Sequence, residues 1–256
     1  MPALQKFRVP PINEVVCGLM FEAIPGLDPL TIGFYARQRE ADFPKHELHP
    51  ALGAAPIIMG GSSVPIRVWL ISRDEAFVIQ MQGDRFYLNW RARGGEYPRF
   101  SGAEGREGIV DKLRGEFEKF SAFCEHEFGK RPAVSGFELA KIDQLIEGKH
   151  WKGLEDLGEV VPWLRTVPSF SRSDSPLISV RFVEPREGGQ LSVSLDLATG
   201  KDEQGPVRLA KLESRIVRSG KGDIGAVSEE FLRANEELNE VFTAVIPLEQ
   251  AVRRFN

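Results

Sequence analysis

The stretch that decides the fold is Phe77-Val78-Ile79-Gln80-Met81-Gln82-Gly83-Asp84-Arg85-Phe86-Tyr87-Leu88-Asn89-Trp90-Arg91. Two runs rich in strand-forming residues flank Gly83-Asp84, and glycine at the first central position is typical of a type II′ turn. A two-residue turn fixes the register, so Gln82 is expected opposite Arg85. The sequence therefore predicts an antiparallel hairpin over residues 77–91.

This register separates the side chains into two faces, because successive residues of a strand point in opposite directions. One face is apolar and is expected to lie in the core; it carries Phe77, Ile79, Met81, Phe86, Leu88 and Trp90. The other face is mainly polar, and a short loop follows it. The candidate binding residues are those of this polar face and of the loop: Gln80, Gln82, Arg85, Tyr87, Asn89, Arg91, Tyr97 and Arg99.

The rest of the first half is read outward from the hairpin. Apolar residues predict a strand over 12–23, and Asp28-Pro29 is typical of a helix start. Prolines and glycines indicate a loop over 45–65, and a strand follows over 66–72. Apolar residues at spacings of three and four predict a long helix over 106–128, which is expected to cover the apolar face of the sheet.

The second half repeats this order of elements. We expect a strand near 137–146, a short helix within 153–164, and a meander over 177–184, 190–198 and 207–217, although 207–217 also fits a helix. A closing helix is predicted over 228–245.

The predicted fold class is α+β, with two mainly antiparallel sheet-plus-helix halves over residues 1–132 and 133–256. Both halves follow the order strand, helix, meander, long helix, which raises the possibility of a pseudo-repeat without residue identity.

Composition excludes several classes of protein. The chain has 256 residues, of which 42% are hydrophobic and 27% charged, so it is too apolar to be disordered. Two cysteines exclude a disulfide scaffold and fit buried thiols. A net charge of −4 argues against general nucleic-acid binding. With no apolar leader or membrane span in the sequence, a cytoplasmic location is expected.

Self-contained catalytic motifs are missing from the sequence: it has no P-loop, HExxH, paired CxxC or GxSxG. Residues 220–225 match GxGxxG, but no strand follows the closing helix, so a turn is the better interpretation. His46 and His49 lie in the predicted loop without further ligands nearby. No cofactor or metal is predicted, and enzymatic activity is left uncertain, with a non-enzymatic role favoured.

The polar hairpin face has three interpretations. An ordinary solvated sheet face is one, because antiparallel sheets often expose one side to water. The second is a binding surface, since arginine forks and tyrosine rings suit a protein partner, an anionic ligand or RNA. The third is a small enzyme acting on an anionic or nucleic-acid ligand, in which Arg85, Arg91 and Arg99 hold the anion. Four arginines lie between residues 85 and 99 against the single acid Glu96.

Several motifs resemble a sporadically distributed, uncharacterised prokaryotic protein family. They are Pro10-Pro11-Ile12-Asn13-Glu14-Val15, the hairpin run Gln80–Arg91 with its Asn-Trp-Arg end, and Tyr97-Pro98-Arg99-Phe100. The likeness spans nearly the whole chain. It departs at Asn235, where the family's last helix often carries a histidine. The patchy distribution implies an accessory, partner-binding role, with a place on a mobile or defence cassette.

Overall fold

The computed structural model describes most of the chain. The described residues are 7–52, 66–93, 97–98, 100–101, 107–166, 177–202, 205–220 and 224–255. Arg99, one of the predicted binding residues, lies outside them. So do residues 221–223 of the predicted turn at 220–225.

Nine strands form one antiparallel sheet in the order β2-β3-β4-β5-β1-β6-β9-β8-β7. The strands are β1 Ile12–Phe21, β2 Lys45–Pro50, β3 Ile66–Ile71, β4 Phe77–Gln82, β5 Arg85–Arg91, β6 Val134–Ile146, β7 Ile178–Arg186, β8 Gly189–Asp202 and β9 Gly205–Ser219. The helices are α1 Pro29–Gln38, α2 Ile109–Phe128, α3 Gly153–Val160, the 3-10 turn η1 Pro162–Leu164, α5 Ile224–Val245 and α6 Leu248–Phe255. The predicted α+β class is confirmed; the pseudo-repeat stays a prediction.

The chain divides into two compact units that are not contiguous in sequence. Unit 1 comprises residues 1–13, 140–216 and 233–256, and unit 2 comprises residues 14–139 and 217–232. Strands β1, β6 and β9 and helix α5 each contribute residues to both units. The predicted halves 1–132 and 133–256 therefore differ from the compact units at these four shared elements.

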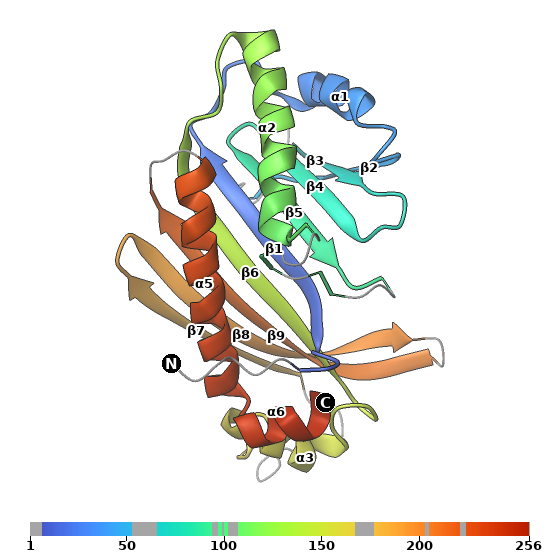
Figure 1. Cartoon of the computed structure of the whole chain (residues 1–256). Helices are drawn as coiled ribbons and strands as arrows, with labels where there is room; N and C mark the ends of the chain where they lie inside the picture. Colours follow the sequence, from blue (N-terminus) through green and yellow to red (C-terminus); the bar gives the residue numbers. More distant parts are fainter. Residues whose placement is uncertain are drawn as a thin grey trace, which may run out of the picture. The chain divides into compact units, whose positions relative to one another are not determined.

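The hairpin β4–β5 has the predicted register. Gln82 pairs with Arg85, Ile79 with Leu88, and Phe77 with Trp90. Helix α2 crosses the strands of unit 2 on their apolar side (Figure 1). The Phe86 ring lies 5.1 Å from the Phe120 ring, and Phe21 lies 5.9 Å from the same ring. The apolar face of the hairpin is therefore the core of unit 2, as the alternation predicts.

Local signals set the helix ends. Asp28 caps α1 by accepting hydrogen bonds from the Leu30 and Thr31 N–H groups, each at 3.0 Å. Gly129 ends α2 in the left-handed conformation, with φ of 65°, a backbone geometry that favours glycine. Helix α2 begins at Ile109 rather than at residue 106, because the Gly108 N–H donates to the Asp111 carboxylate and closes the first turn there.

Three sequence-based expectations are wrong in detail. Part of the predicted loop 45–65 is strand β2, an edge strand that pairs antiparallel with β3. Its mostly exposed side chains leave no apolar alternation for sequence reasoning to detect. The closing helix starts at Ile224 instead of residue 228, since Val227 already contributes a buried side chain. Helix α6 was not expected.

The strand predicted over residues 207–217 is confirmed, because these residues lie in strand β9 and do not form the alternative helix.

The core of unit 1 includes polar groups. The indole of Trp151 lies in this core, and its Nε1–H donates to the Leu145 carbonyl at 2.7 Å. On β6 the Lys141 ammonium donates to the Asn239 amide oxygen of α5. Asp143 is buried two residues further along β6. Among the described residues, no helix is long and apolar enough to cross a membrane.

The buried Asp143 carboxyl makes the free energy of unfolding depend on pH. Burial raises the pKa of Asp143 from 3.8 to about 7, although the Lys141 charge opposes the shift. The folded state therefore holds a proton that the unfolded state releases, and stability falls as pH rises between these two pKa values. We expect Asp143→Asn to raise the thermal unfolding midpoint above pH 7, with a gain that shrinks toward pH 4.

The matched control is Glu155→Gln, which removes an exposed carboxylate of α3 in the same unit. It should leave the difference between high and low pH unchanged. An equal midpoint for Asp143→Asn and the unmodified protein at every pH would contradict this interpretation.

Candidate functional site: the polar face of unit 2

The polar side chains of the hairpin lie on the sheet face opposite α2, together with residues from the neighbouring strands. Trp69 of β3 pairs with Gln80 of β4, Gln80 with Tyr87 of β5, and Tyr87 with Gly18 of β1. We call this set the polar face. Its members are Glu14, Arg67, Trp69, Gln80, Gln82, Arg85, Tyr87, Asn89, Arg91 and Glu138, all in unit 2.

A chain of hydrogen bonds runs across its centre. Arg85 donates from Nη1 to the Tyr87 hydroxyl at 3.3 Å, and that hydroxyl donates to Glu138 Oε2 at 3.0 Å. To reach β6, the Tyr87 ring lies over β1 at Gly18. A Cβ atom at Gly18 would stand 2.1 Å from Tyr87 Cε1, so only glycine leaves room for the ring. Burial and the Glu138 charge raise the pKa of Tyr87 to about 12, so its hydroxyl stays protonated.

The polar face is not an ordinary solvated surface. Gln80 is 4% exposed, Tyr87 is 1% exposed and Asn89 is 3% exposed. Arg85 and Arg91 are half-buried. Burying polar groups costs free energy unless each finds a hydrogen-bond partner, so the pairing of these groups decides what the face can do.

That pairing is incomplete. Five of the nine buried side-chain atoms that lack a hydrogen-bond partner within the described part of the chain lie on the polar face. They are Arg67 Nε, Trp69 Nε1, Arg85 Nε, Asn89 Oδ1 and Arg91 Nε. Four of the five are N–H donors. Native proteins satisfy the large majority of buried polar side-chain atoms, so such a concentration on one face calls for an explanation.

Two arginines of the polar face, Arg67 and Arg91, have a lowered pKa, and burial is the largest cause in both. Burial lowers the pKa of Arg67, although the Glu138 charge acts in the opposite direction. Burial and the nearby Arg93 charge lower the pKa of Arg91, which Glu14 opposes. In both cases the loss of water outweighs the attraction of the neighbouring acids.

The remaining predicted residues differ in their surroundings. Asn89 donates to Glu14 Oε1 at 2.5 Å. Gln82 shares the face but is engaged, because its amide oxygen accepts from the Leu52 N–H at 2.9 Å and its nitrogen donates to Asp84 at 2.8 Å. The Tyr97 ring packs edge-on against Trp90 at 5.0 Å, on the side opposite to the polar face. The sequence grouped Tyr97 with the face, and the structure does not bring it there.

Sequence reasoning missed Arg67, Trp69, Glu14 and Glu138. The alternation of Arg67 and Trp69 with Val68 and Leu70 is a signal that could have placed the first two on one side of β3. Placing them beside Gln80 and Tyr87, however, requires the strand order. Trp69 also stacks on the His49 ring of β2, with ring centroids 3.9 Å apart.

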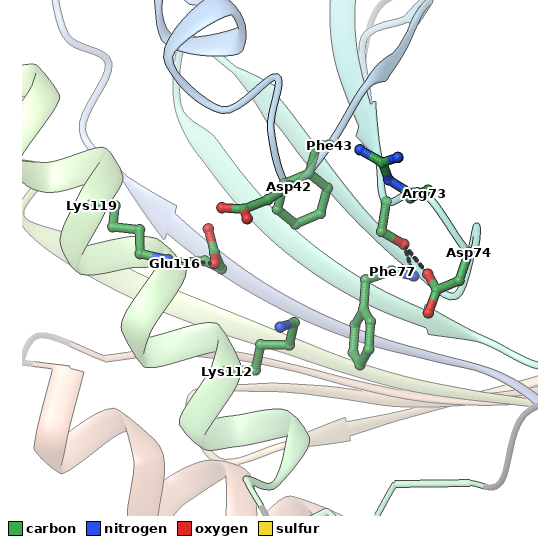
Figure 2. Close-up of a pocket in the computed structure, with 9 residues that line it drawn as sticks. Asp42, Phe43, Arg73, Asp74, Phe77, Lys112, Glu116 and Lys119 are labelled. Atoms are coloured by element: carbon green, nitrogen blue, oxygen red, sulfur yellow. Dashed lines mark hydrogen bonds and ion pairs between the residues drawn. The ribbon is translucent and has the colours of Figure 1, made fainter.

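A pocket of about 560 Å³ beside α2 is the second candidate in unit 2. Figure 2 shows side chains from α2, from the α1–β2 connection and from the β3–β4 turn around it. Its lining residues are Asp42, Phe43, Ser72, Arg73, Asp74, Phe77, Lys112, Glu116 and Lys119.

The buried carboxylate of this pocket is already paired. Glu116 accepts from Arg39 at 2.8 and 3.0 Å and from Lys119 at 2.8 Å. The Lys112 ammonium lies 4.8 Å from the centre of the Phe77 ring. Because its buried carboxylate is already satisfied, this pocket gives a weaker argument for a ligand than the polar face.

Metal ligation has no support in the described ranges. No group of three or more His, Cys, Asp or Glu side chains is placed there to hold a metal ion. His46 contacts the Phe43 carbonyl at 3.1 Å, whereas His49 contacts Glu47 at 2.9 Å. Three residues apart on strand β2, the two imidazoles point to opposite sides.

Comparisons with known proteins add no further constraint on the site. No model of a known protein family matches the chain, and no curated protein sequence matches it either.

The close approach of Tyr87 to Gly18 predicts a specific packing defect. Gly18→Ala should displace the ring, break the Tyr87–Glu138 hydrogen bond and destabilise the protein by about 1–3 kcal/mol. Chemical denaturation measures this loss. In a Tyr87→Ala background the same Gly18→Ala change should cost little, because the clashing ring is gone.

The control is Gly115→Ala in α2, where a Cβ would meet nothing within 4 Å. In a helix interior this change should stabilise by about 0.5–1 kcal/mol. Equal costs for Gly18→Ala with and without Tyr87 would show that the ring does not set the requirement for glycine.

Proposed function

We propose that the protein is a non-enzymatic binding protein whose polar face receives a carboxylate group of a partner. The observation that carries this proposal is the set of buried N–H donors without hydrogen-bond partners among the described residues. These donors are Arg67 Nε, Trp69 Nε1, Arg85 Nε and Arg91 Nε. A ligand rich in acceptor oxygens would accept hydrogen bonds from these donors. The free energy of these hydrogen bonds would then be gained only in the complex.

Donor geometry supports a carboxylate over other acceptors. Three of the four donors belong to the guanidinium groups of Arg67, Arg85 and Arg91. A planar guanidinium matches carboxylate geometry in two parallel hydrogen bonds. Arginine and tryptophan are also the residue types that dominate binding energy at protein interfaces.

RNA binding through Tyr87, one of the sequence-based alternatives, draws less support. Base stacking needs an open ring face. The Tyr87 ring is 1% exposed and lies over Gly18, and Trp69 already stacks on His49. An accessory role on a mobile or defence cassette stays a prediction from the family resemblance.

The proposal predicts that a substitution of Arg67 that weakens ligand binding does not lower the free energy of unfolding. Removing an incompletely paired, half-buried guanidinium should cost nothing in stability, and an apolar replacement of similar length should gain about 1 kcal/mol. We therefore expect Arg67→Met to raise the midpoint of chemical unfolding. A destabilisation of more than about 1 kcal/mol would mean that Arg67 is a structural residue.

Binding is tested with two carboxylate probes, a hexaglutamate peptide and free glutarate, by isothermal titration at low salt. We expect Arg67→Met together with Arg91→Met to weaken binding by about tenfold or more, since each lost charge-assisted hydrogen bond is worth about 1.5–3 kcal/mol. The matched control is Arg114→Met with Arg165→Met, which removes two exposed arginines that do not belong to the polar face.

The probes distinguish the source of the carboxylate. Binding of the peptide alone indicates an acidic protein segment, whereas binding of both indicates recognition of the group itself. A uridine dodecamer is titrated in parallel. Binding of the dodecamer with no binding of either carboxylate, or equal weakening by the control variant, would refute the proposal.

A further inference from the structure

A second site of different chemistry lies in unit 1, in a pocket of about 240 Å³. Three segments meet there: the turn after β6, the start of α3 and the end of α6. Figure 1 places α3 beside α6, and ion pairs join the two helices. The lining residues are Gly148, Lys149, His150, Trp151, Lys152, Asp156, Arg253 and Arg254.

The pocket carries a large excess of positive charge. Four of its side chains are cationic and only Asp156 is acidic. That carboxylate is already occupied, because Arg254 donates to its two oxygens at 2.6 and 3.1 Å. Arg254 also donates to the His150 carbonyl at 2.5 Å, which holds the guanidinium in place.

The other three cations are available to a ligand. The side chains of Lys149, Lys152 and Arg253 are exposed and make no hydrogen bond or close ion pair with any residue that the structure describes. Like charges gathered in a concave site repel one another, so an anion bound among them would relieve that repulsion.

His150 supplies a neutral ring N–H at the same pocket. Its Nδ1 accepts the Ile146 N–H at 2.9 Å, so the proton of the neutral ring resides on Nε2. Burial, with the charges of Lys149 and Arg254, lowers the pKa of His150 to about 4, so the ring is neutral at physiological pH. The side chain is 4% exposed, and Nε2 has no hydrogen-bond partner among the described residues.

We propose that this pocket binds a small phosphoryl-bearing anion, either inorganic phosphate or a phosphomonoester. Lys149 and Lys152 before α3, Arg253 and Arg254 of α6, and His150 all line one small volume. This arrangement suits a multiply charged, tetrahedral group with several acceptor oxygens. A volume of about 240 Å³ lies below the usual range for drug-sized ligands, which favours a small anion over an extended one.

This site is independent of the polar face. Its residues all belong to unit 1, whereas the polar face belongs to unit 2. Failure of the carboxylate proposal would leave the phosphate proposal intact, and the Arg67→Met with Arg91→Met variant should bind phosphate unchanged.

The test is a titration of the full chain with inorganic phosphate, followed by NMR of the His150 ring at a pH where phosphate is largely dianionic. Saturable shifts of the His150 resonances are expected as the anion binds. A parallel titration with glycerol 3-phosphate shows whether the pocket accepts a monoester.

The variant Lys149→Gln with Arg253→Gln should weaken phosphate binding by about tenfold for each charge-assisted hydrogen bond that it removes. Both side chains are exposed, so the fold should be retained. The control, Arg165→Gln with Arg181→Gln, removes the same charge from exposed positions of unit 1 and should bind as the unmodified protein does.

Two results would overturn the proposal. One is the absence of saturable His150 shifts with both ligands. The other is an equal loss of affinity in the Lys149/Arg253 variant and in its control, which would indicate only a general attraction of anions to a positive surface.

Discussion

The register of the β4–β5 hairpin is the constraint on which the rest of unit 2 depends. A two-residue turn at Gly83-Asp84 sets Gln82 against Arg85, and the alternation of side chains then separates two chemistries. Phe86 and its apolar neighbours meet α2, whereas Tyr87 and the arginines meet the opposite side. A shift by one residue would exchange the two faces and would bury the arginines against the phenyl rings of α2.

The polar face depends on a second constraint, the space above Gly18. Because β1 has no side chain there, Tyr87 crosses it and reaches Glu138 of β6. Three strands are thereby joined by one aromatic side chain on the face that lacks α2. The Tyr87 hydroxyl donates to Glu138 and accepts from Arg85. Arg67 and Arg91 then keep N–H groups without partners among the described residues, which is why this face is proposed to receive a carboxylate.

Sequence reasoning succeeded where the signal is local. The hairpin register, the Asp28 cap and the glycine end of α2 depend on residues close together in the chain. It failed at β2, whose pairing with β3 is long-range and whose side chains are mostly exposed. The candidate site follows the same division. The sequence placed Asn89 and Arg91 together, but Trp69 and Glu138 join them only through strand order.

Burial was the other quantity that the sequence could not supply. A polar face on an antiparallel sheet is expected to be wet, yet Gln80 and Asn89 are almost fully buried. Gln82 illustrates the consequence, because its amide holds the Leu52 backbone and is not available to a ligand. The same reasoning applies to His150, whose neutral state follows from burial and neighbouring charges rather than from its sequence context.

The central claim is that donors of the polar face, which are buried and have no hydrogen-bond partner among the described residues, become paired when a partner binds. The most direct measurement is ¹H–¹⁵N NMR of the Trp69 Nε1–H and of the Arg67 and Arg91 Nε–H groups. The account predicts signals that exchange slowly with water, lack scalar coupling across a hydrogen bond, and move downfield when an acidic peptide is added. Hydrogen-bond couplings to acceptors of the protein itself, in the absence of any ligand, would contradict it.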